Sequence, residues 1–229
     1  MERNYKMYKC DIVISTRGRL EKLKQVLESI PGNTAGVELQ IRLAFDGDEV
    51  NFKKVAFGRK LHPLLGRISY IDGPRGNVYC RNELIKACED AVLYSTDDII
   101  FQPGAISKAV WDMRDHFPDD DGVIGFTQTG NKKFHPTGVA LVGRKFLARY
   151  PHKQLFYPKY FHFACQEIHD AAVKLNKFFL SKAEVFHMNP FIEKKYMDKT
   201  HHEARILKDE DHKLMAERKK KGLIWGING

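Results

Sequence analysis

Two adjacent aspartates, Asp97 and Asp98, follow a short apolar segment at residues 92–94. Because neighbouring carboxylates repel each other, an acid pair at the end of a buried strand requires a positive counter-charge. Mg²⁺ and Mn²⁺ prefer oxygen ligands, so a divalent cation could supply that charge. The alternative is a solvated acidic turn or a pair that caps a helix, and the two residues alone do not separate these interpretations.

Polar clusters stand at the ends of three predicted strands, which cover residues 9–15, 37–45 and 92–94. Parallel strands that are joined by helices bring their carboxyl ends to one edge of a sheet, where ligands bind. The clusters at these ends are Ser15-Thr16-Arg17, Asp46-Gly47-Asp48 and Thr96-Asp97-Asp98. We therefore expect the three clusters to contribute to one binding site.

The elements that must hold these clusters alternate between strand and helix. Apolar residues recur with helical spacing over residues 20–30, and strict alternation over residues 37–45 predicts a strand. The other expected elements are a strand at 67–71, a helix leading into a strand over 76–94, a helix from Pro103, strands at 122–127, 138–142 and 178–187, and helices at 167–175 and 200–221. This order predicts an α/β fold with a mostly parallel central sheet flanked by helices.

Composition favours a soluble globular chain. The 229 residues are 43% hydrophobic, which suits one domain with a full core, or one domain with a short appendage. No stretch approaches the roughly 18 uninterrupted apolar residues of a membrane span, and the N-terminus lacks the apolar core of a signal peptide. We therefore expect a cytoplasmic protein. The four cysteines form no C-x-x-C pair, which favours buried thiols over a zinc site.

The formal net charge of +9 indicates an anionic partner, such as a nucleotide diphosphate, a nucleic acid or a membrane surface. Lysines gather around the last predicted helix, at Lys194, Lys195 and Lys199 and again at 219–221. A run of charge is also what a solvated helix face looks like. A non-catalytic module that binds nucleic acid is thus one interpretation of the chain, although it contains no helix-turn-helix, zinc-finger or RNA-recognition signature.

The motifs, taken in order, resemble the inverting glycosyltransferases of GT-A fold and family 2 type. The resemblance rests on Ile-Val-Ile-Ser-Thr-Arg at 12–17, Asp46, Gly-Asn-Val-Tyr-Cys-Arg-Asn at 76–82, Ser-Thr-Asp-Asp at 95–98, Gln166-Glu167 and His187. It implies a single GT-A domain over residues 1–190, with a nucleotide-sugar binding half at 1–101 and an acceptor-side half at 102–190. Residues 191–229 would form a charged helical extension that packs on the same domain.

The resemblance also implies a role for each motif. The residues expected to bind the nucleotide sugar are Ser15, Thr16, Arg17, Asp46, Arg75, Arg81 and Asp97. The expected ligands of Mn²⁺ or Mg²⁺ are Asp97, Asp98 and His187. Asp97 matches the last acid of the family's D-x-D motif, whose first acid is replaced here by Ser95. Glu167 matches the catalytic base, and Asp170, one helical turn later, is the alternative base.

The function that follows is metal-dependent, inverting transfer of a sugar from a nucleoside diphosphate sugar, with a UDP-sugar as the first choice, to an acceptor hydroxyl. A cation would stabilise the leaving diphosphate, and a carboxylate would take the proton of the acceptor. A hydroxylated base in DNA is one acceptor that suits the basic chain. A nucleotidyltransferase-like enzyme on a similar sheet is the alternative enzymatic interpretation. The aromatic cluster Tyr157, Tyr160, Phe161 and Phe163 is expected either to pack in the core or to stack on a sugar or base.

Overall fold

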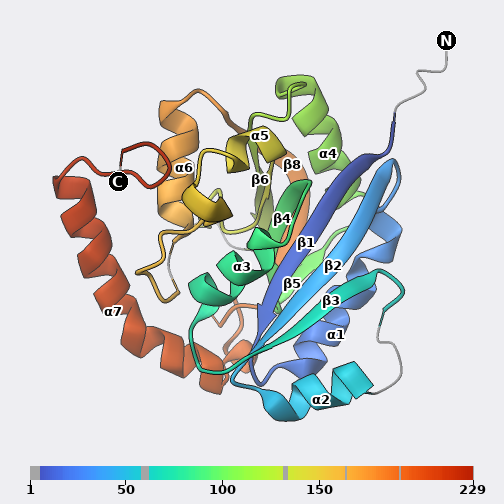
Figure 1. Ribbon diagram of the computed structural model, residues 1–229. Coiled ribbons are helices and arrows are strands. Elements are labelled where there is room, and N and C mark those ends of the chain that lie inside the picture. Colours follow the sequence, from blue (N-terminus) through green and yellow to red (C-terminus); the bar gives the residue numbers. More distant parts are fainter. Residues whose placement is uncertain (1–5, 58–61, 131–133, 163, 191, 229) are drawn as a thin grey trace.

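A computed structural model describes residues 6–57, 62–130, 134–162, 164–190 and 192–228, and Figure 1 shows the arrangement of its elements. The described strands form one eight-stranded sheet in the order β3-β2-β1-β4-β7-β6-β8-β5. Helices cover both faces of this sheet, and the last helix, α7, runs along one side of the molecule (Figure 1). The predicted α/β fold with a mostly parallel sheet is confirmed.

Four parallel strands make up the first half of the sheet. They are β1 (Tyr8–Thr16), β2 (Val37–Asp46), β3 (Leu65–Ile71) and β4 (Ala91–Thr96), and they are connected by α1 (Leu20–Ser29), α2 (Glu49–Phe57) and α3 (Asn77–Lys86). In β1, Ile12 and Ile14 pack into one core cluster, and Val13 packs into the other on the opposite face. Because β1 is buried on both faces, residues 12–14 are consecutive apolar residues rather than an alternating pattern.

The second half of the sheet contains β5 (Ile99–Phe101), β6 (Val123–Thr129), β7 (Ala140–Val142) and β8 (Phe178–His187). The helices of this half are α4 (Ala105–His116), α5 (Arg144–Leu147) and α6 (Cys165–Lys174). β5 begins directly after the acid pair and lies antiparallel to β8, with Ile99 opposite His187. This register brings the last residue of β8 beside the end of β4, so distant parts of the chain meet at the carboxyl edge of the first four strands.

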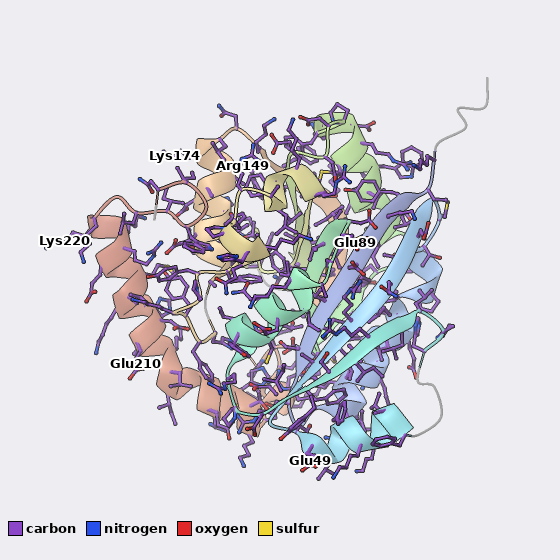
Figure 2. All side chains as sticks on the ribbon, viewed as in Figure 1. Glu49, Glu89, Arg149, Lys174, Glu210 and Lys220 are labelled. Atoms are coloured by element: carbon purple, nitrogen blue, oxygen red, sulfur yellow. The ribbon has the colours of Figure 1, made fainter. Side chains whose placement is uncertain are left out.

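Helix α7 (Lys199–Lys220) begins at this carboxyl edge and runs toward α6. Asp198 caps its first turn by accepting a hydrogen bond from the backbone N–H of His201 at 3.0 Å. Exposed side chains such as Glu210 and Lys220 point away from the body (Figure 2). Hydrogen bonds and ion pairs tie α7 to the body at its start, middle and end, which is how a helix with little apolar surface remains docked.

Most of the elements expected from the sequence are present, within a few residues at each end. Three elements were not expected from the sequence: α2, whose single buried side chain is Val55, the three-residue β5 and the four-residue α5. Short or half-exposed elements of this kind carry little periodic signal. Of the helices in the described ranges, none is both long and apolar enough to cross a membrane.

Candidate active site at the carboxyl edge of the sheet

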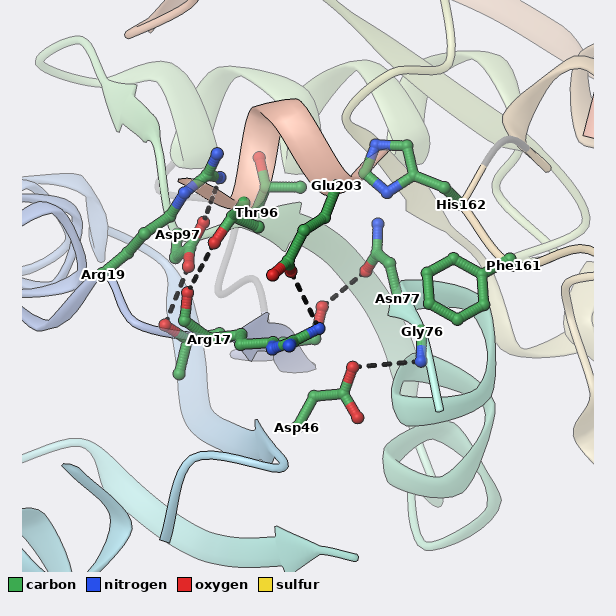
Figure 3. Close-up of a pocket in the computed structure, with 13 residues that line it drawn as sticks. Arg17, Arg19, Asp46, Gly76, Asn77, Thr96, Asp97, Phe161, His162 and Glu203 are labelled. Carbon is green, nitrogen blue, oxygen red and sulfur yellow. Dashed lines mark hydrogen bonds and ion pairs between the residues drawn. The ribbon is translucent and has the colours of Figure 1, made fainter. Parts of the chain in front are cut away.

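A pocket opens where β1, β2 and β4 end, and Figure 3 shows the residues that line it. The sequence-predicted residues among them are Ser15, Thr16, Arg17, Asp46 and Asp97. The others are Arg19, Gly76, Asn77, Thr96, Phe161, His162, Thr200 and Glu203. The fold thus brings residues from all three polar clusters into one pocket, to which the start of α7 adds two side chains.

Both carboxylates of the acid pair are buried and hydrogen-bonded. Thr16 Oγ1 donates to Asp97 Oδ2 at 2.8 Å, and Thr96 Oγ1 donates to Asp98 Oδ1 at 2.6 Å. Burial raises the pKa of the Asp97 carboxyl above its usual range. Burial acts in the same direction on Asp98, but the charge of His187 and hydrogen bonds from His187 and His201 outweigh it and hold its pKa well below the usual range. The pKa values of the two neighbouring acids are therefore shifted in opposite directions, that of Asp97 upward and that of Asp98 downward.

The counter-charge in this arrangement is the guanidinium of Arg19. Its Nη1 lies 3.1 Å from Asp97 Oδ1 and 3.2 Å from Asp98 Oδ2, and its Nη2 lies 2.9 Å from Asp198 Oδ1. Burial acts to lower the pKa of Arg19, but the three carboxylates outweigh burial and raise it. The Nε of Arg19 is buried and has no hydrogen-bond partner among the described residues. Arg19 was not predicted as a site residue, because nothing in the sequence sets it apart from Arg17.

Two imidazoles approach Asp98 rather than Asp97. His187 Nε2 lies 3.4 Å from Asp98 Oδ1, and His201 Nε2 lies 3.6 Å from Asp98 Oδ2. The other ring nitrogen of His187 lies 3.2 Å from the side-chain oxygen of Gln128. The sequence had matched Asp97 to the metal-binding acid of the D-x-D motif, whereas the histidine expected to share the ion lies beside Asp98. His201 was not predicted.

The chemistry of this donor set fits a divalent cation, although the present arrangement does not gather it around one point. Carboxylate oxygens and imidazole nitrogens suit Mn²⁺, and a metal-binding histidine usually directs its other ring nitrogen to a carbonyl or carboxylate oxygen, as His187 does toward Gln128. Within the described parts of the chain, no three His, Cys, Asp or Glu side chains converge closely enough to hold an ion. Arg19 balances the negative charge of Asp97 and Asp98, and it also contacts His201.

Asp46 fixes the turn that leads into α3. Its Oδ1 accepts from the backbone N–H of Arg75 at 2.7 Å, and its Oδ2 accepts from that of Gly76 at 3.0 Å. Gly76 has φ of +90°, and a Cβ there would meet the carbonyl oxygen of Phe161 at 2.6 Å. Only glycine fits this position without strain. Asp46 therefore lines the pocket with its carboxylate already engaged by two backbone donors.

Arg75 and Arg81 do not line the pocket, as far as the described residues define it. Arg75 points outward, where its Nε donates to the carbonyl of Asp72 and its guanidinium lies over the ring of Tyr79. Arg81 is buried beneath the acid pair, and its Nη2 donates to the carbonyl of Ser95 at 2.8 Å. Burial lowers the pKa of Arg81. The predicted roles of both arginines in binding the nucleotide sugar stay predictions.

Glu167 is held by four donors. Its carboxylate accepts from Arg218 Nε at 2.6 Å and Nη2 at 2.9 Å, from the backbone N–H of Trp225 at 2.7 Å and from the hydroxyl of Tyr160. Burial acts to raise the pKa of Glu167, but these hydrogen bonds and the charge of Arg218 lower it. The carboxylate thus fastens the end of α7 and the C-terminal segment to α6.

Glu167 and Asp170 line a second cavity, together with Lys174, Met215 and Lys219 among others. Asp170 accepts a hydrogen bond from the side-chain amide of Gln166 at 3.1 Å. Judged on the described residues, neither acid lines the pocket that contains Asp97. The structure therefore does not bring the two predicted bases to the acid pair, and their catalytic role stays a prediction.

The start of α7 forms one wall of the acid-pair pocket (Figure 3). Thr200 Oγ1 donates to the carbonyl of Arg17 at 2.9 Å, and Arg17 Nη1 pairs with Glu203 Oε2 at 3.0 Å. On the opposite wall, Ser15 Oγ donates to Asn77 Oδ1 at 2.5 Å. Thr200 and Glu203 were not predicted, because a helix that docks from far along the chain leaves no local signal. Asn77 belongs to the motif at residues 76–82 but was not singled out as a site residue.

The described members of the aromatic cluster lie in two different places. Phe161 lines the pocket, together with His162, whose pKa is lowered to about 4 by burial. Tyr160 is buried against Glu167, and the Cζ atom of Arg218 lies 3.6 Å from the centre of the Tyr157 ring. These two tyrosines thus pack the end of α7 against the body. Phe163 lies outside the described residues.

No protein-family model and no curated protein matches the chain. Among solved structures, residues 1–349 of S. aureus TarS align with a TM-score of 0.58 at 14% identity, over 80% of this chain and 61% of that one. The same protein in complex with UDP aligns with a TM-score of 0.57 at 14% identity, over 78% and 57% of the two chains. The mannosyltransferase PcManGT from Pyrobaculum calidifontis, in complex with GDP-Man and Mn²⁺, aligns with a TM-score of 0.60 at 12% identity, over 78% and 56%.

This chain spans less than two thirds of the length of each of these solved chains. At 12–15% identity, the likeness concerns the fold. The chain therefore has the GT-A-like fold of glycosyltransferases.

Proposed function

We propose that this chain is a glycosyltransferase that takes its sugar from a nucleoside diphosphate sugar and requires a divalent cation. The observation that carries the proposal is the pocket at the carboxyl edge, where a buried acid pair meets the ends of β1 and β2 and the start of α3 in a GT-A-like fold. Solved chains of similar fold are described in complex with UDP, or with GDP-Man and Mn²⁺. UDP-sugars are accordingly the first donors to test, and GDP-mannose is the next.

We assign the donor to the pocket that Ser15, Thr16, Arg17 and Asp46 line. The hydrogen bonds of Asp46 to two backbone N–H groups support a positioning role, in which Asp46 shapes the turn before α3 beside the nucleoside. Arg19, buried beside the acid pair, is suited to bind the negatively charged diphosphate, since a guanidinium presents a planar fork of donors to phosphate oxygens.

We assign the cation to Asp98 and His187, with Asp97 beside them. The approach of His187 to Asp98 at 3.4 Å and the low pKa of Asp98 both support this choice, because a metal ligand must be deprotonated. A bound Mn²⁺ or Mg²⁺ would act as a Lewis acid that stabilises the leaving diphosphate. Asp97, whose carboxylate faces Thr16 and Arg19, would help to hold Arg19 beside that diphosphate.

We propose that the reaction inverts the anomeric centre and that Asp170 removes the proton of the acceptor. A carboxylate held by a guanidinium and two further donors is a weak base, which argues against Glu167. Asp170 instead accepts a hydrogen bond from the uncharged side-chain amide of Gln166. Direct attack from the face opposite the diphosphate requires no second carboxylate as a nucleophile.

The test is a screen of UDP-sugars and GDP-mannose with the full chain, with and without Mn²⁺. The true donor should raise the melting temperature most when Mn²⁺ is present, because a ligand that binds only the folded state stabilises it by mass action. The same donor should release nucleoside diphosphate when an acceptor is added, and EDTA should stop this release reversibly. Release of pyrophosphate would instead support nucleotidyl transfer, and unchanged turnover in EDTA would contradict the metal requirement.

For the acceptor, we propose a hydroxylated base in DNA, a choice supported by the net charge of +9. Transfer of a labelled sugar to DNA with hydroxymethylated bases should exceed transfer to unmodified DNA of the same sequence. Binding to either DNA should weaken steeply with salt, because lysine and arginine contacts release counterions from the phosphates. Equal transfer to a simple carbohydrate and to the modified DNA would contradict this choice of acceptor.

A further inference from the structure

The first turn of α7 reaches the acid pair through one side chain, His201. Its Nε2 lies 3.6 Å from Asp98 Oδ2, and its ring is largely buried, with 16% of the side chain exposed. His201 lies more than 100 residues along the chain from Asp98, so this contact is a product of how α7 docks rather than of local structure.

We propose that His201 is a further metal-binding side chain, which brings the first turn of α7 into the divalent-cation site of Asp98 and His187. This inference rests on the metal site assigned under the proposed function. It adds to that site a ligand from the C-terminal extension, so the cation would join the extension to the sheet.

The two histidines flank the same carboxylate in equivalent ways. His187 approaches Asp98 Oδ1 and His201 approaches Asp98 Oδ2, in each case through Nε2. In each ring the other nitrogen, Nδ1, lies within hydrogen-bond distance of an oxygen, that of Gln128 at 3.2 Å and that of Asp198 at 2.9 Å. In the present arrangement Arg19 Nη2, which can only donate, lies 2.8 Å from His201 Nδ1, so the ring proton of His201 is on Nε2 and faces Asp98. With Arg19 displaced, the oxygen of Asp198 would accept the ring proton at Nδ1, which would leave the lone pair on Nε2 for a cation.

Both Nε2 atoms face the carboxylate of Asp98, so a cation that displaced Arg19 would face two imidazoles and one carboxylate. A metal ion satisfies both imidazoles and the carboxylate at once. The support that Gln128 and Asp198 provide at Nδ1 is also what orients metal-binding histidines in general. Asp198 in addition caps α7 through the backbone N–H of His201, so ring and helix start are held by the same carboxylate.

Arg19 now occupies the place beside Asp97 and Asp98 that a cation would take. Its two terminal nitrogens contact both acids, Asp198 and His201 Nδ1, the last at 2.8 Å, while its Nε is left without a partner among the described residues. A guanidinium with one buried donor unpaired is an incomplete fit to the cluster. A divalent cation would compete with Arg19 for the same carboxylates, which would free the arginine for a phosphate group.

The test is Mn²⁺ binding to the full chain without nucleotide, measured by calorimetry and by the electron paramagnetic resonance signal of free Mn²⁺. His201→Gln should weaken Mn²⁺ binding by at least about tenfold. The matched control is His202→Gln, because His202 is the next residue of the same turn and is exposed. The control should bind Mn²⁺ as the unchanged chain does.

A second pair of variants gives a signal that loss of folding cannot imitate. Co²⁺ added to the His201→Cys variant should produce a thiolate-to-cobalt charge-transfer band, since a cysteine sulfur at a metal site binds as the thiolate. The His202→Cys variant should give no band beyond that of the unchanged chain, whose Cys10, Cys80 and Cys88 are buried.

Unchanged Mn²⁺ affinity in His201→Gln, together with no new band in His201→Cys, would overturn the inference. If Asp98→Asn and His187→Gln still lost Mn²⁺ binding in that case, the metal site of the proposed function would stand without His201. If those two variants bound Mn²⁺ normally, the proposed metal site would be wrong and the inference would fall with it.

Discussion

The two ends of α7 dock on buried carboxylates, and the two contacts differ in how completely charge and hydrogen bonds are matched. At the end of the helix, one carboxylate, Glu167, meets one guanidinium, Arg218, and two uncharged donors complete its shell. At the start, Arg19 is shared among Asp97, Asp98 and Asp198, and its Nε has no partner among the described residues. Lys22 completes the cluster by pairing with Asp198 at 2.6 Å.

This difference separates a structural contact, that of Glu167 and Arg218, from a candidate functional site, the cluster around Asp97 and Asp98. A buried ion pair whose hydrogen-bonding groups are all paired leaves no donor or acceptor for a ligand, and its role is to hold segments together. A buried cluster with more carboxylates than fixed cations has negative charge that is not fully balanced, and a bound cation could balance it. The proton affinities agree, since the pKa of Glu167 is lowered whereas the pKa values of Asp97 and Asp98 are driven apart.

The largest effect is expected from Glu167→Gln, which should lower the free energy of unfolding by about 3–5 kcal/mol because it leaves the charge of Arg218 buried without its partner. Both side chains are only 7% exposed. Chemical denaturation checks this value. Glu83→Gln, which breaks the partly exposed pair with Lys86, is the matched control and should cost no more than about 1 kcal/mol.

Adding Arg218→Met to Glu167→Gln should recover part of the loss, since the unpaired charge is then removed as well. If Glu167→Gln folded as stably as the unchanged chain but lost turnover, the comparison would be broken, and Glu167 would be the catalytic base that the sequence predicted.

The next largest effect is expected on turnover, from a change in the acid cluster at the start of α7. Asp98→Asn should lower turnover by about 10²–10³-fold, the range typical of losing one group that stabilises charge in the transition state. Its stability should fall by less than that of Glu167→Gln, because Asp97 and Asp198 still pair with Arg19. Release of nucleoside diphosphate measures the turnover. Asp115→Asn, an exposed acid on α4, should retain full activity, and an equal loss in both variants would remove the distinction between the two ends of α7.

A smaller effect, a gain in Mn²⁺ affinity rather than a loss of activity, is expected from Arg19→Gln. Removal of the guanidinium should tighten Mn²⁺ binding in the absence of nucleotide by about tenfold, since a positive charge close to both carboxylates opposes a cation there. Calorimetric titration gives the affinity. Arg218→Gln removes a buried arginine at the other end of α7 and should leave Mn²⁺ affinity unchanged. Weaker binding in Arg19→Gln would mean that Arg19 supports the ion rather than competes with it.

The smallest effect is one of pH. The pKa of Glu167 is lowered in the folded chain, so its contribution to stability is present above the pKa of the unfolded chain, about 4.3, and is lost as pH falls through the lower folded value. The difference in melting temperature between the unchanged chain and Glu167→Gln should therefore be constant near neutral pH and narrow below about pH 4. A difference that widened on acidification would contradict the assigned direction.

Much of the fold could be predicted because its signals are local. The apolar run before Ser15, the alternation before Asp46 and the strand before Asp97 each predict an element, and their order predicts a parallel sheet with shared carboxyl ends. The pocket at this edge, with residues of all three clusters around it, agrees with that prediction. The division into residues 1–190 and 191–229 stays a prediction, since α7 is tied to the body along its length.

The sequence by itself determined which strands end in polar residues and that these ends share one edge. Only the tertiary structure decided that His187 faces Asp98, because the register between β5 and β8 sets this contact and a shift by one residue would turn the side chain to the other face. It also decided that α7 adds His201 to one acid cluster and Arg218 to the other. These contacts join residues between 51 and 182 positions apart in the chain, and no local pattern encodes such distances.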